Sequence, residues 1–142
     1  MNELKRMNYL FSEMNYVFHQ LSLSQGLSDS ACAILYTLWD SDGCCPLKMI
    51  LEYTGIPKQT VNSALRKLEQ EGIVYLEKSE GRKKTVCLTQ AGITLAKSTV
   101  GRIMEVENAI LDSWSGKERE LYLSLTQRYL DQFREKAKEL CK

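Results

Sequence analysis

Hydrophobic side chains recur every three or four residues along most of the chain, which is the spacing of amphipathic helices. In a first helix predicted over about residues 1–25, the apolar positions are Leu4, Met7, Phe11, Met14, Phe18 and Leu21. Further helices of this period are predicted over residues 29–39, 47–53, 90–114 and 116–140. Ser28 and Thr89 are suitable N-caps for two of them. The last begins with a capping box, Ser115-Gly116-Lys117-Glu118.

The segment from Ile56 to Gly72 predicts a helix with one narrow apolar stripe. Pro57 suits its first position and Gly72 its C-terminal end. The stripe contains Val61, Ala64, Leu65 and Leu68. The opposite face carries polar side chains, flanked by Thr60 and Lys67: Gln59, Asn62, Ser63, Arg66 and Gln70. A short helix, a glycine turn and a polar-faced helix follow one another as in a helix-turn-helix, although a generic helical hairpin would look similar.

A two-stranded hairpin is predicted next, from Ile73–Lys78 and Thr85–Leu88. Its connection contains Gly81, which accepts a positive φ, followed by Arg82, Lys83 and Lys84. Adjacent cations repel one another, so folding gives no reason for them at a hairpin tip. A neighbouring phosphate backbone does, and the hairpin is therefore interpreted as the wing of a winged helix-turn-helix.

The same window resembles the wing region of MarR-type transcriptional regulators. The matching motifs are Leu68-Glu69, Gly72-Ile73-Val74, Arg82 and Leu88-Thr89-Gln90-Ala91-Gly92, with Glu80 where the family usually has Asp. The resemblance implies a winged helix fold, dimerisation through the terminal helices and control by a small, frequently phenolic, ligand. Four side chains could line a pocket for such an effector, although aromatic residues at these spacings are more often core: Tyr9, Tyr16, His19 and Trp39.

The distribution of charge along the chain supports the predicted helix and wing. The chain has 142 residues, of which 44% are hydrophobic and 26% charged, with a net charge of +1. These values fit one globular domain and give no global signature of a nucleic-acid binder. Residues 57–84, however, contain seven Lys or Arg and four Glu, a net charge of +3. The positive excess therefore lies where the helix and wing are predicted.

The expected fold class is mainly α with a small β-hairpin (α+β). The predicted domains are an N-terminal dimerisation helix over 1–27, a winged helix-turn-helix lobe over 28–89 and C-terminal dimerisation helices over 90–142. At about 1.5 Å per residue, the three terminal helices are each roughly 35 Å long, more than a winged helix needs. Apolar stripes on such arms favour a two-fold dimer, with a core-facing stripe within one chain as the alternative.

The expected function is sequence-specific binding of double-stranded DNA as a homodimer, by a repressor of a pseudo-palindromic operator. Residues predicted to read bases are Gln59, Asn62, Ser63 and Arg66. Residues predicted to hold phosphates are Lys58, Thr60, Lys67, Lys83 and Lys84. Arg82 is expected in a flanking minor groove.

Other chemistry is poorly represented. The five cysteines are odd in number and lack CxxC spacing, so reduced thiols are expected, without a disulfide framework, metal site or cofactor. The single His19 and the lack of a catalytic motif argue against an enzyme. Without a membrane span or signal peptide, a cytoplasmic protein is expected. Two alternatives remain: a protein-interaction module, and a thiol-based redox sensor, although relatives of that kind use a cysteine early in the first helix and this chain has none before Cys32.

Overall fold

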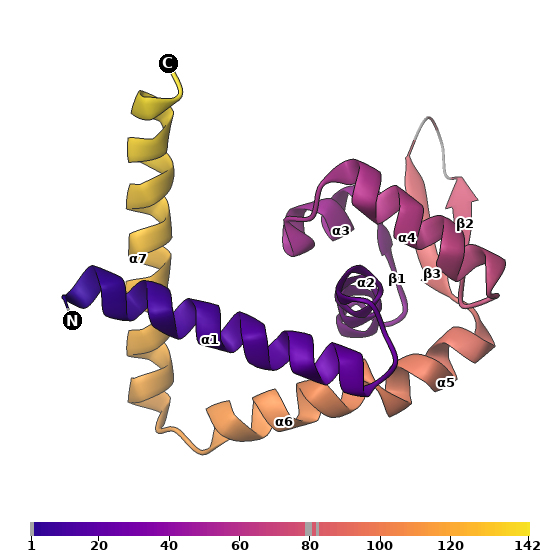
Figure 1. Ribbon diagram of the computed structural model, residues 1–142, viewed down its shortest axis with the longest axis horizontal. Helices are drawn as coiled ribbons and strands as arrows, with labels where there is room; N and C mark the ends of the chain where they lie inside the picture. The colour runs from indigo at the N-terminus through magenta and orange to yellow at the C-terminus, as the bar shows by residue number, and fades with distance from the viewer. Residues whose placement is uncertain (1, 79–80, 82) are drawn as a thin grey trace. The chain divides into compact units, whose positions relative to one another are not determined.

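The computed structural model describes residues 2–78, 81 and 83–142. These residues form seven helices and one three-stranded antiparallel sheet (Figure 1). In chain order the elements are α1 (Glu3–Ser24), α2 (Asp29–Asp40), β1 (Cys44–Pro46), α3 (Leu47–Thr54), α4 (Lys58–Gln70), β2 (Val74–Lys78), β3 (Lys84–Leu88), α5 (Gln90–Ser98), α6 (Val100–Asp112) and α7 (Gly116–Leu140). The predicted fold class is confirmed.

The predicted helix caps are present. Ser28 Oγ accepts a hydrogen bond of 3.1 Å from the backbone N–H three residues on, and Thr89 Oγ1 accepts one of 3.0 Å from Gly92 N–H. In the capping box, Glu118 N–H donates to Ser115 Oγ at 3.1 Å and Ser115 N–H donates to Glu118 Oε1 at 2.8 Å. These bonds satisfy backbone donors that a helix start leaves free, so they fix where each helix begins.

A single hydrophobic core surrounds α2, which contacts α1, α3, α4, α5, β1 and β3. The buried apolar side chains of this core are Cys32, Ile34, Leu35, Leu38, Cys45, Ile50, Val61, Leu65, Leu68, Val74, Val86, Leu88, Ala96, Val100 and Ile103. These residues come from α2, α3 and α4, from all three strands, and from α5 and α6. Burial of this apolar surface is what holds the helix-turn-helix against the sheet.

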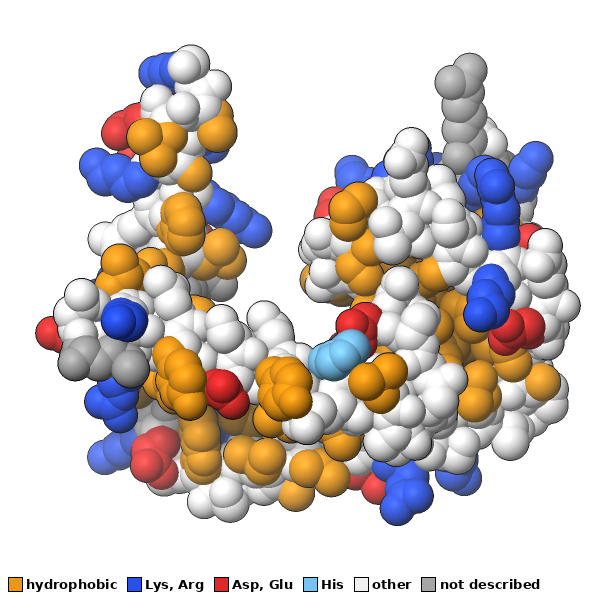
Figure 2. Space-filling view, in the orientation of Figure 1, with side chains coloured by type: hydrophobic (Ala, Val, Ile, Leu, Met, Phe, Trp, Pro, Cys, Tyr) orange, Lys and Arg blue, Asp and Glu red, His pale blue; other side chains and the backbone are white. Residues whose placement is uncertain are grey.

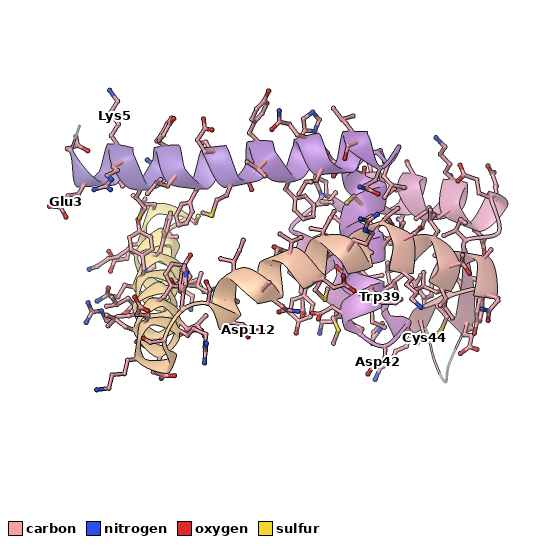
Figure 3. The ribbon with its side chains drawn as sticks, turned by 90° about the horizontal axis from the view of Figure 1, so that it is seen from below. Glu3, Lys5, Trp39, Asp42, Cys44 and Asp112 are labelled. Carbon is pink, nitrogen blue, oxygen red and sulfur yellow. A yellow bond between two sulfur atoms is a disulfide. The ribbon has the colours of Figure 1, made fainter. Side chains whose placement is uncertain are left out.

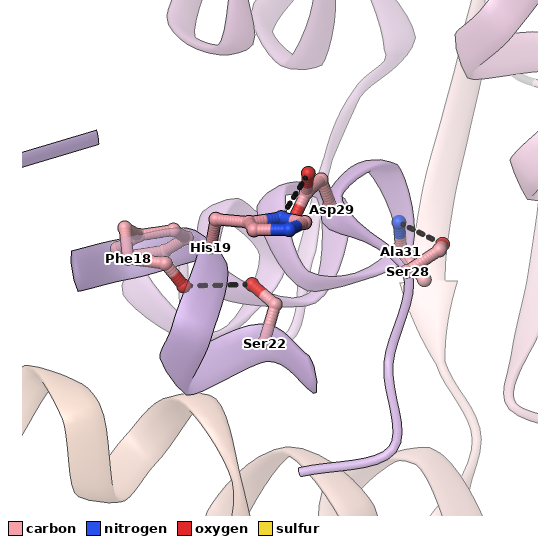
Figure 4. A network of polar contacts seen from close by, with 6 residues as sticks. All are labelled: Phe18, His19, Ser22, Ser28, Asp29 and Ala31. Atoms are coloured by element: carbon pink, nitrogen blue, oxygen red, sulfur yellow. Dashed lines mark hydrogen bonds and ion pairs between the residues drawn. The ribbon is translucent and has the colours of Figure 1, made fainter. Parts of the chain in front are cut away.

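Only the C-terminal part of α1 joins this core. Phe18 and Leu21 pack against it, and Phe18 makes an edge-to-face contact with Tyr36, with ring centroids 5.9 Å apart. On the surface, His19 Nδ1 lies 2.7 Å from Asp29 Oδ2 and thereby connects α1 to α2 (Figure 4). Nearer the N-terminus, the predicted stripe is exposed at Leu4, Phe11 and Met14. Two of the six stripe residues thus pack against the core, and three are uncovered.

Strand β1 was not predicted. The sheet has the order β1-β3-β2, and β1 pairs with β3 in the register Cys44↔Cys87, Cys45↔Val86 and Pro46↔Thr85. Three residues are too few to show an alternating pattern, and Pro46 lacks a backbone donor. The sequence therefore predicted the β2–β3 hairpin but placed residues 44–46 before a helix without a strand.

The helix predicted over 90–114 is two helices, and this prediction was wrong. Thr99 interrupts it with φ −119° and ψ −90°, and its Oγ1 donates to the Leu95 carbonyl at 2.7 Å. The next helix passes close to Trp39, because a Cβ on Gly101 would lie 3.1 Å from the indole ring. The buried, β-branched Thr99 gives the backbone a local partner outside the helical pattern, so the chain can turn there.

By its backbone contacts the chain divides into one unit ending at Met104 and a second from Glu105 to Lys142. In the second unit, Trp114 packs edge-on against Tyr122, and Arg119 Nη1 donates to the Leu111 and Trp114 carbonyls at 3.1 and 2.8 Å. These contacts fix the turn before α7. Among the described residues, no helix combines the length and apolar character needed to cross a membrane.

Helix α7 itself has no buried residue, although it is rich in large apolar side chains. Those exposed along it are Leu121, Tyr122, Leu123, Leu125, Tyr129, Leu130, Phe133 and Leu140. Figure 2 shows hydrophobic side chains at the surface of both α1 and α7.

Candidate nucleic-acid interface

The turn between α3 and α4 is built by three residues. Gly55 adopts the left-handed conformation with φ 64°, which a side chain rarely tolerates. Thr54 Oγ1 donates to the Ile50 carbonyl at 2.7 Å and accepts from Ile56 N–H at 3.3 Å. The end of α3 and the start of α4 are therefore fixed to each other, and the predicted helix-turn-helix is present.

The orientation of α4 follows from its buried stripe. Val61, Leu65 and Leu68 are at most 4% exposed, as predicted. At its C-terminus, Gly72 has φ 74°, and Ile73 N–H donates to the Leu68 carbonyl at 2.9 Å. This arrangement is a Schellman cap, which satisfies the last carbonyls and turns the chain into β2. With one face locked into the core, the polar face of α4 must point outwards.

The predicted contact residues in the described part of the chain lie at the surface. Exposed members are Lys58, Gln59, Thr60, Ser63, Arg66, Lys67, Lys83 and Lys84, whereas Asn62 is half-buried. Arg82 lies outside the described residues, as do Ser79 and Glu80 in the wing connection. Figure 2 shows Lys and Arg side chains gathered over α4 and the strands that follow it. The structure thus places cations of the helix and of the wing on one side of the lobe.

Three of these residues share one depression. It has a volume of about 230 Å³ and lies between α3, α4 and the β2–β3 hairpin. Its lining residues are Leu47, Asn62, Leu65, Arg66, Glu69, Leu76 and Lys84. The amide and guanidinium of α4 therefore face the same hollow as a wing ammonium, a link between helix and hairpin that the sequence pattern could not supply.

The foot of the wing is tied to α5 by Thr89. Its Oγ1 donates to the Gly72 carbonyl at 2.5 Å, and its N–H donates to the Ile73 carbonyl at 3.0 Å. Gly92 lies so close that an added Cβ would stand 2.1 Å from Ile73 O. The Leu88–Gly92 motif therefore closes the hairpin against the end of α4, and only glycine fits at position 92.

The aromatic residues considered for an effector pocket stand in different surroundings. Tyr9 and Tyr16 are 53% and 56% exposed on α1, whereas the Trp39 indole packs against Gly101. His19 is engaged with Asp29 at the surface. Among the described residues, no group of three or more His, Cys, Asp or Glu side chains could hold a metal ion.

The expectation of reduced thiols was wrong for one pair, because a disulfide joins Cys44 to Cys87. The two residues are direct partners in the β1–β3 register, which brings their side chains to the same place on the sheet. Sequence reasoning missed this bond because it missed β1. Their separation of 43 residues carries no local signal.

Comparison with known proteins agrees with this geometry. A model of the MarR family matches residues 25–84. A MarR family regulator from Neisseria meningitidis is 26% identical with a TM-score of 0.80, and all of both chains is covered. MepR of S. aureus, solved in complex with DNA, is 21% identical with a TM-score of 0.69 over 94% of this chain and 98% of that one.

A MarR family regulator from Silicibacter pomeroyi is 20% identical, with a TM-score of 0.69 over 89% of this chain and 86% of that one. No curated protein sequence gave a match. The resemblance predicted from the wing motif is confirmed by the matched segment and by the fold of the whole chain. Residues 25–84 thus match the MarR family, and the chain as a whole has the winged helix fold of MarR family transcriptional regulators.

Proposed function

We propose that this protein is a sequence-specific regulator that binds a pseudo-palindromic operator as a homodimer and represses until a small aromatic ligand releases it. The observation that carries the proposal is the two-sided character of α4. One face is buried at Val61, Leu65 and Leu68, and the other presents amides, hydroxyls and cations beside the wing. A major groove accepts a helix with such a face.

Within this proposal the contacts divide by chemistry. Gln59, Asn62, Ser63 and Arg66 read base edges, because their amides, hydroxyl and guanidinium can pair with specific donors and acceptors. Lys58, Thr60, Lys67, Lys83 and Lys84 hold phosphates, which positions the helix without reading sequence. Arg82 enters a flanking minor groove, where a guanidinium responds to groove width and potential.

The dimer is proposed to form through residues 1–27 and 90–142. Support comes from the uncovered apolar side chains of α7 and of the N-terminal half of α1. Water would surround these side chains in a single chain, and burying them against a second copy is favourable. A two-fold axis then sets the two α4 helices about 34 Å apart, so that they enter successive major grooves.

The proposed effector acts by changing the distance between the two α4 helices of the dimer. A ligand that prefers a pair of chains with a different spacing of the α4 helices lowers the fraction able to bind the operator. S. aureus MepR, which has been solved in complex with DNA, supports DNA binding as the activity of this chain. A module for protein contacts remains the competing function, and DNA binding in solution separates the two.

Two variants test the proposal in a gel shift with a duplex selected from random DNA. Leu125→Glu places a carboxylate on the exposed apolar face of α7, and Ser124→Glu places the same group one residue away on another face. We expect Leu125→Glu to give monomers that lose nearly all binding and Ser124→Glu to bind normally. Binding by the unsubstituted protein should weaken steeply with salt. Binding that ignores salt, or a monomer that binds as well as the dimer, would refute the proposal.

A further inference from the structure

Cys44 and Cys87 are direct cross-strand partners on the sheet and are joined by a disulfide; Figure 3 labels Cys44. Their Cα atoms are 4.1 Å apart, and next to them Leu88 N–H donates to the Gly43 carbonyl at 2.8 Å. The cysteines therefore form a non-hydrogen-bonded pair, where antiparallel strands approach most closely. Cysteines much farther apart need backbone movement before they can be joined. Here the strands already hold the two sulfur atoms together.

The two sulfur atoms differ in access. Cys44 is exposed on the edge strand, whereas Cys87 is 1% exposed on the central strand, between Cys44 and Tyr75 in the register. Cys45 points to the opposite face and into the core, and burial raises the pKa of its thiol. An oxidant from solution therefore meets Cys44 first, Cys87 stands next to it, and Cys45 stays protonated and unreactive.

The bond encloses the DNA-reading half of the lobe. The loop that it closes contains α3, α4, β2 and the wing, so all the predicted DNA contacts from Lys58 to Lys84 lie inside it. Strand β1 is three residues long and ends at Pro46, which offers no backbone donor and occupies the N-cap position of α3 without a side-chain capping bond. Strand β1 is also held by Cys45 in the core and by the Leu88 N–H bond to the Gly43 carbonyl, and the disulfide adds a covalent link to β3 directly before α3 begins.

We propose that Cys44 and Cys87 are a reversible redox latch, closed by hydroperoxides, and that the closed form binds DNA more tightly than the open one. The second half of this proposal rests on the function proposed above. The bond joins residues that are already partners, so it retains the register of the sheet. A helix and wing held in place before binding lose less freedom when they meet DNA.

The closing step balances without a cofactor. The Cys44 thiolate attacks one peroxide oxygen, the O–O bond breaks, and an alcohol or water leaves with a proton, which gives a sulfenic acid. The Cys87 sulfur then attacks the Cys44 sulfur, and the S–O bond breaks with loss of water. Two thiols are oxidised and one hydroperoxide is reduced. A dithiol reductant reverses the bond by exchange and is itself oxidised to a disulfide.

The test uses the full chain in three forms: unsubstituted, Cys44→Ser and Cys141→Ser. Cys141 is the other exposed cysteine, and its substitution is the matched control. Each protein is treated with a modest excess of hydrogen peroxide or with dithiothreitol. Mass spectrometry then follows the bond, hydrogen exchange follows the amides of β1 and α3, and a duplex selected from random DNA measures affinity.

We expect oxidation to protect the amides of β1 and α3 and to tighten DNA binding about tenfold, as for a loop held in its bound conformation. Cys141→Ser should respond in the same way, and Cys44→Ser should behave as the reduced protein under both treatments. Failure of peroxide to form the bond, or a bond that changes neither exchange nor affinity, would overturn the latch. If exchange responds but neither form binds DNA, the latch stands as a structural device and the proposed function fails.

Discussion

The lobe around α2 and the helix α7 both carry large apolar side chains, but only the lobe buries them. In the lobe, Ile34, Leu35 and Leu38 are fully buried, and each element that carries a predicted DNA contact packs against them or their neighbours. Helix α7 buries none of its 25 residues. A surface of this kind is costly in water unless another surface covers it. The lobe is therefore specified within one chain, whereas the apolar side of α7 is covered only in the proposed dimer.

The comparison predicts that removing the same side chain has different consequences in the two regions. Leu38→Ala should leave a cavity and lower the free energy of unfolding by about 4 kcal/mol at every protein concentration. Leu125, which is 44% exposed, should mainly shift the concentration at which the dimer dissociates when it is replaced by Ala. Urea unfolding and sedimentation at several concentrations measure both. A concentration-independent loss for Leu125→Ala would place that side chain in an intrachain core and contradict the comparison.

Adding a methyl group should also have different effects on the stability of the lobe and of α7. Gly92→Ala forces a Cβ against the Ile73 carbonyl, and we expect the lobe to lose about 3 kcal/mol of stability through overpacking. Gly116→Ala at the start of α7 meets nothing closer than Arg119 Nη2 at 3.9 Å and should gain about 0.5 kcal/mol. Thermal unfolding of the two variants gives the comparison. Equal effects would mean that the Thr89–Gly92 junction is not the rigid foot of the wing.

The sequence predicts the elements that local signals specify, and it misses those that depend on residues far away in the chain. Local signals were sufficient for α4, because its apolar stripe, Pro57 and Gly72 all agree, and for the capping box at Ser115. They failed where the structure depends on distant partners. Strand β1 exists only because β3 lies beside it, and the break at Thr99 accompanies a helix that passes close to Trp39.

The candidate site shows the same limit. Exposure of the polar face of α4 followed from periodicity alone, since burying one stripe turns the other outwards. The shared hollow of Asn62, Arg66 and Lys84 did not follow from periodicity, because it requires the hairpin to fold back beside α4. Nor did the Cys44–Cys87 bond, whose residues are 43 apart in sequence.

Removing one positive charge should also have different effects on DNA binding in the lobe and in α7, although the expected effect is smaller. Arg66→Ala should cost about 2 kcal/mol of DNA binding and lower the slope of affinity against salt by about one unit. Arg128→Ala removes the same charge from α7 and should change neither quantity. Fluorescence anisotropy with a labelled operator over a range of salt provides the numbers. An equal loss in both variants would indicate unspecific attraction to the whole molecule.

The smallest expected effect concerns pH. The Ser115 backbone N–H holds the pKa of the Glu118 carboxyl below its ordinary value of 4.5. Because the folded pKa is the lower one, the stabilisation is present above the ordinary pKa and is lost as the pH falls through the folded pKa. Circular dichroism should show the start of α7 loosening in that range, but not in Glu118→Gln. Glu120→Gln, outside the box, should follow the unsubstituted protein.

Selection of bound sequences from random DNA tests the central claim most directly. If two copies of α4 are presented by a symmetric pair of chains, the retained duplexes should share an inverted repeat whose half-sites are centred about one helical turn apart. Asn62→Ala should alter the preferred bases within each half-site while leaving that spacing unchanged. Recovery of a single unrepeated motif, or of no enriched motif at all, would contradict the account.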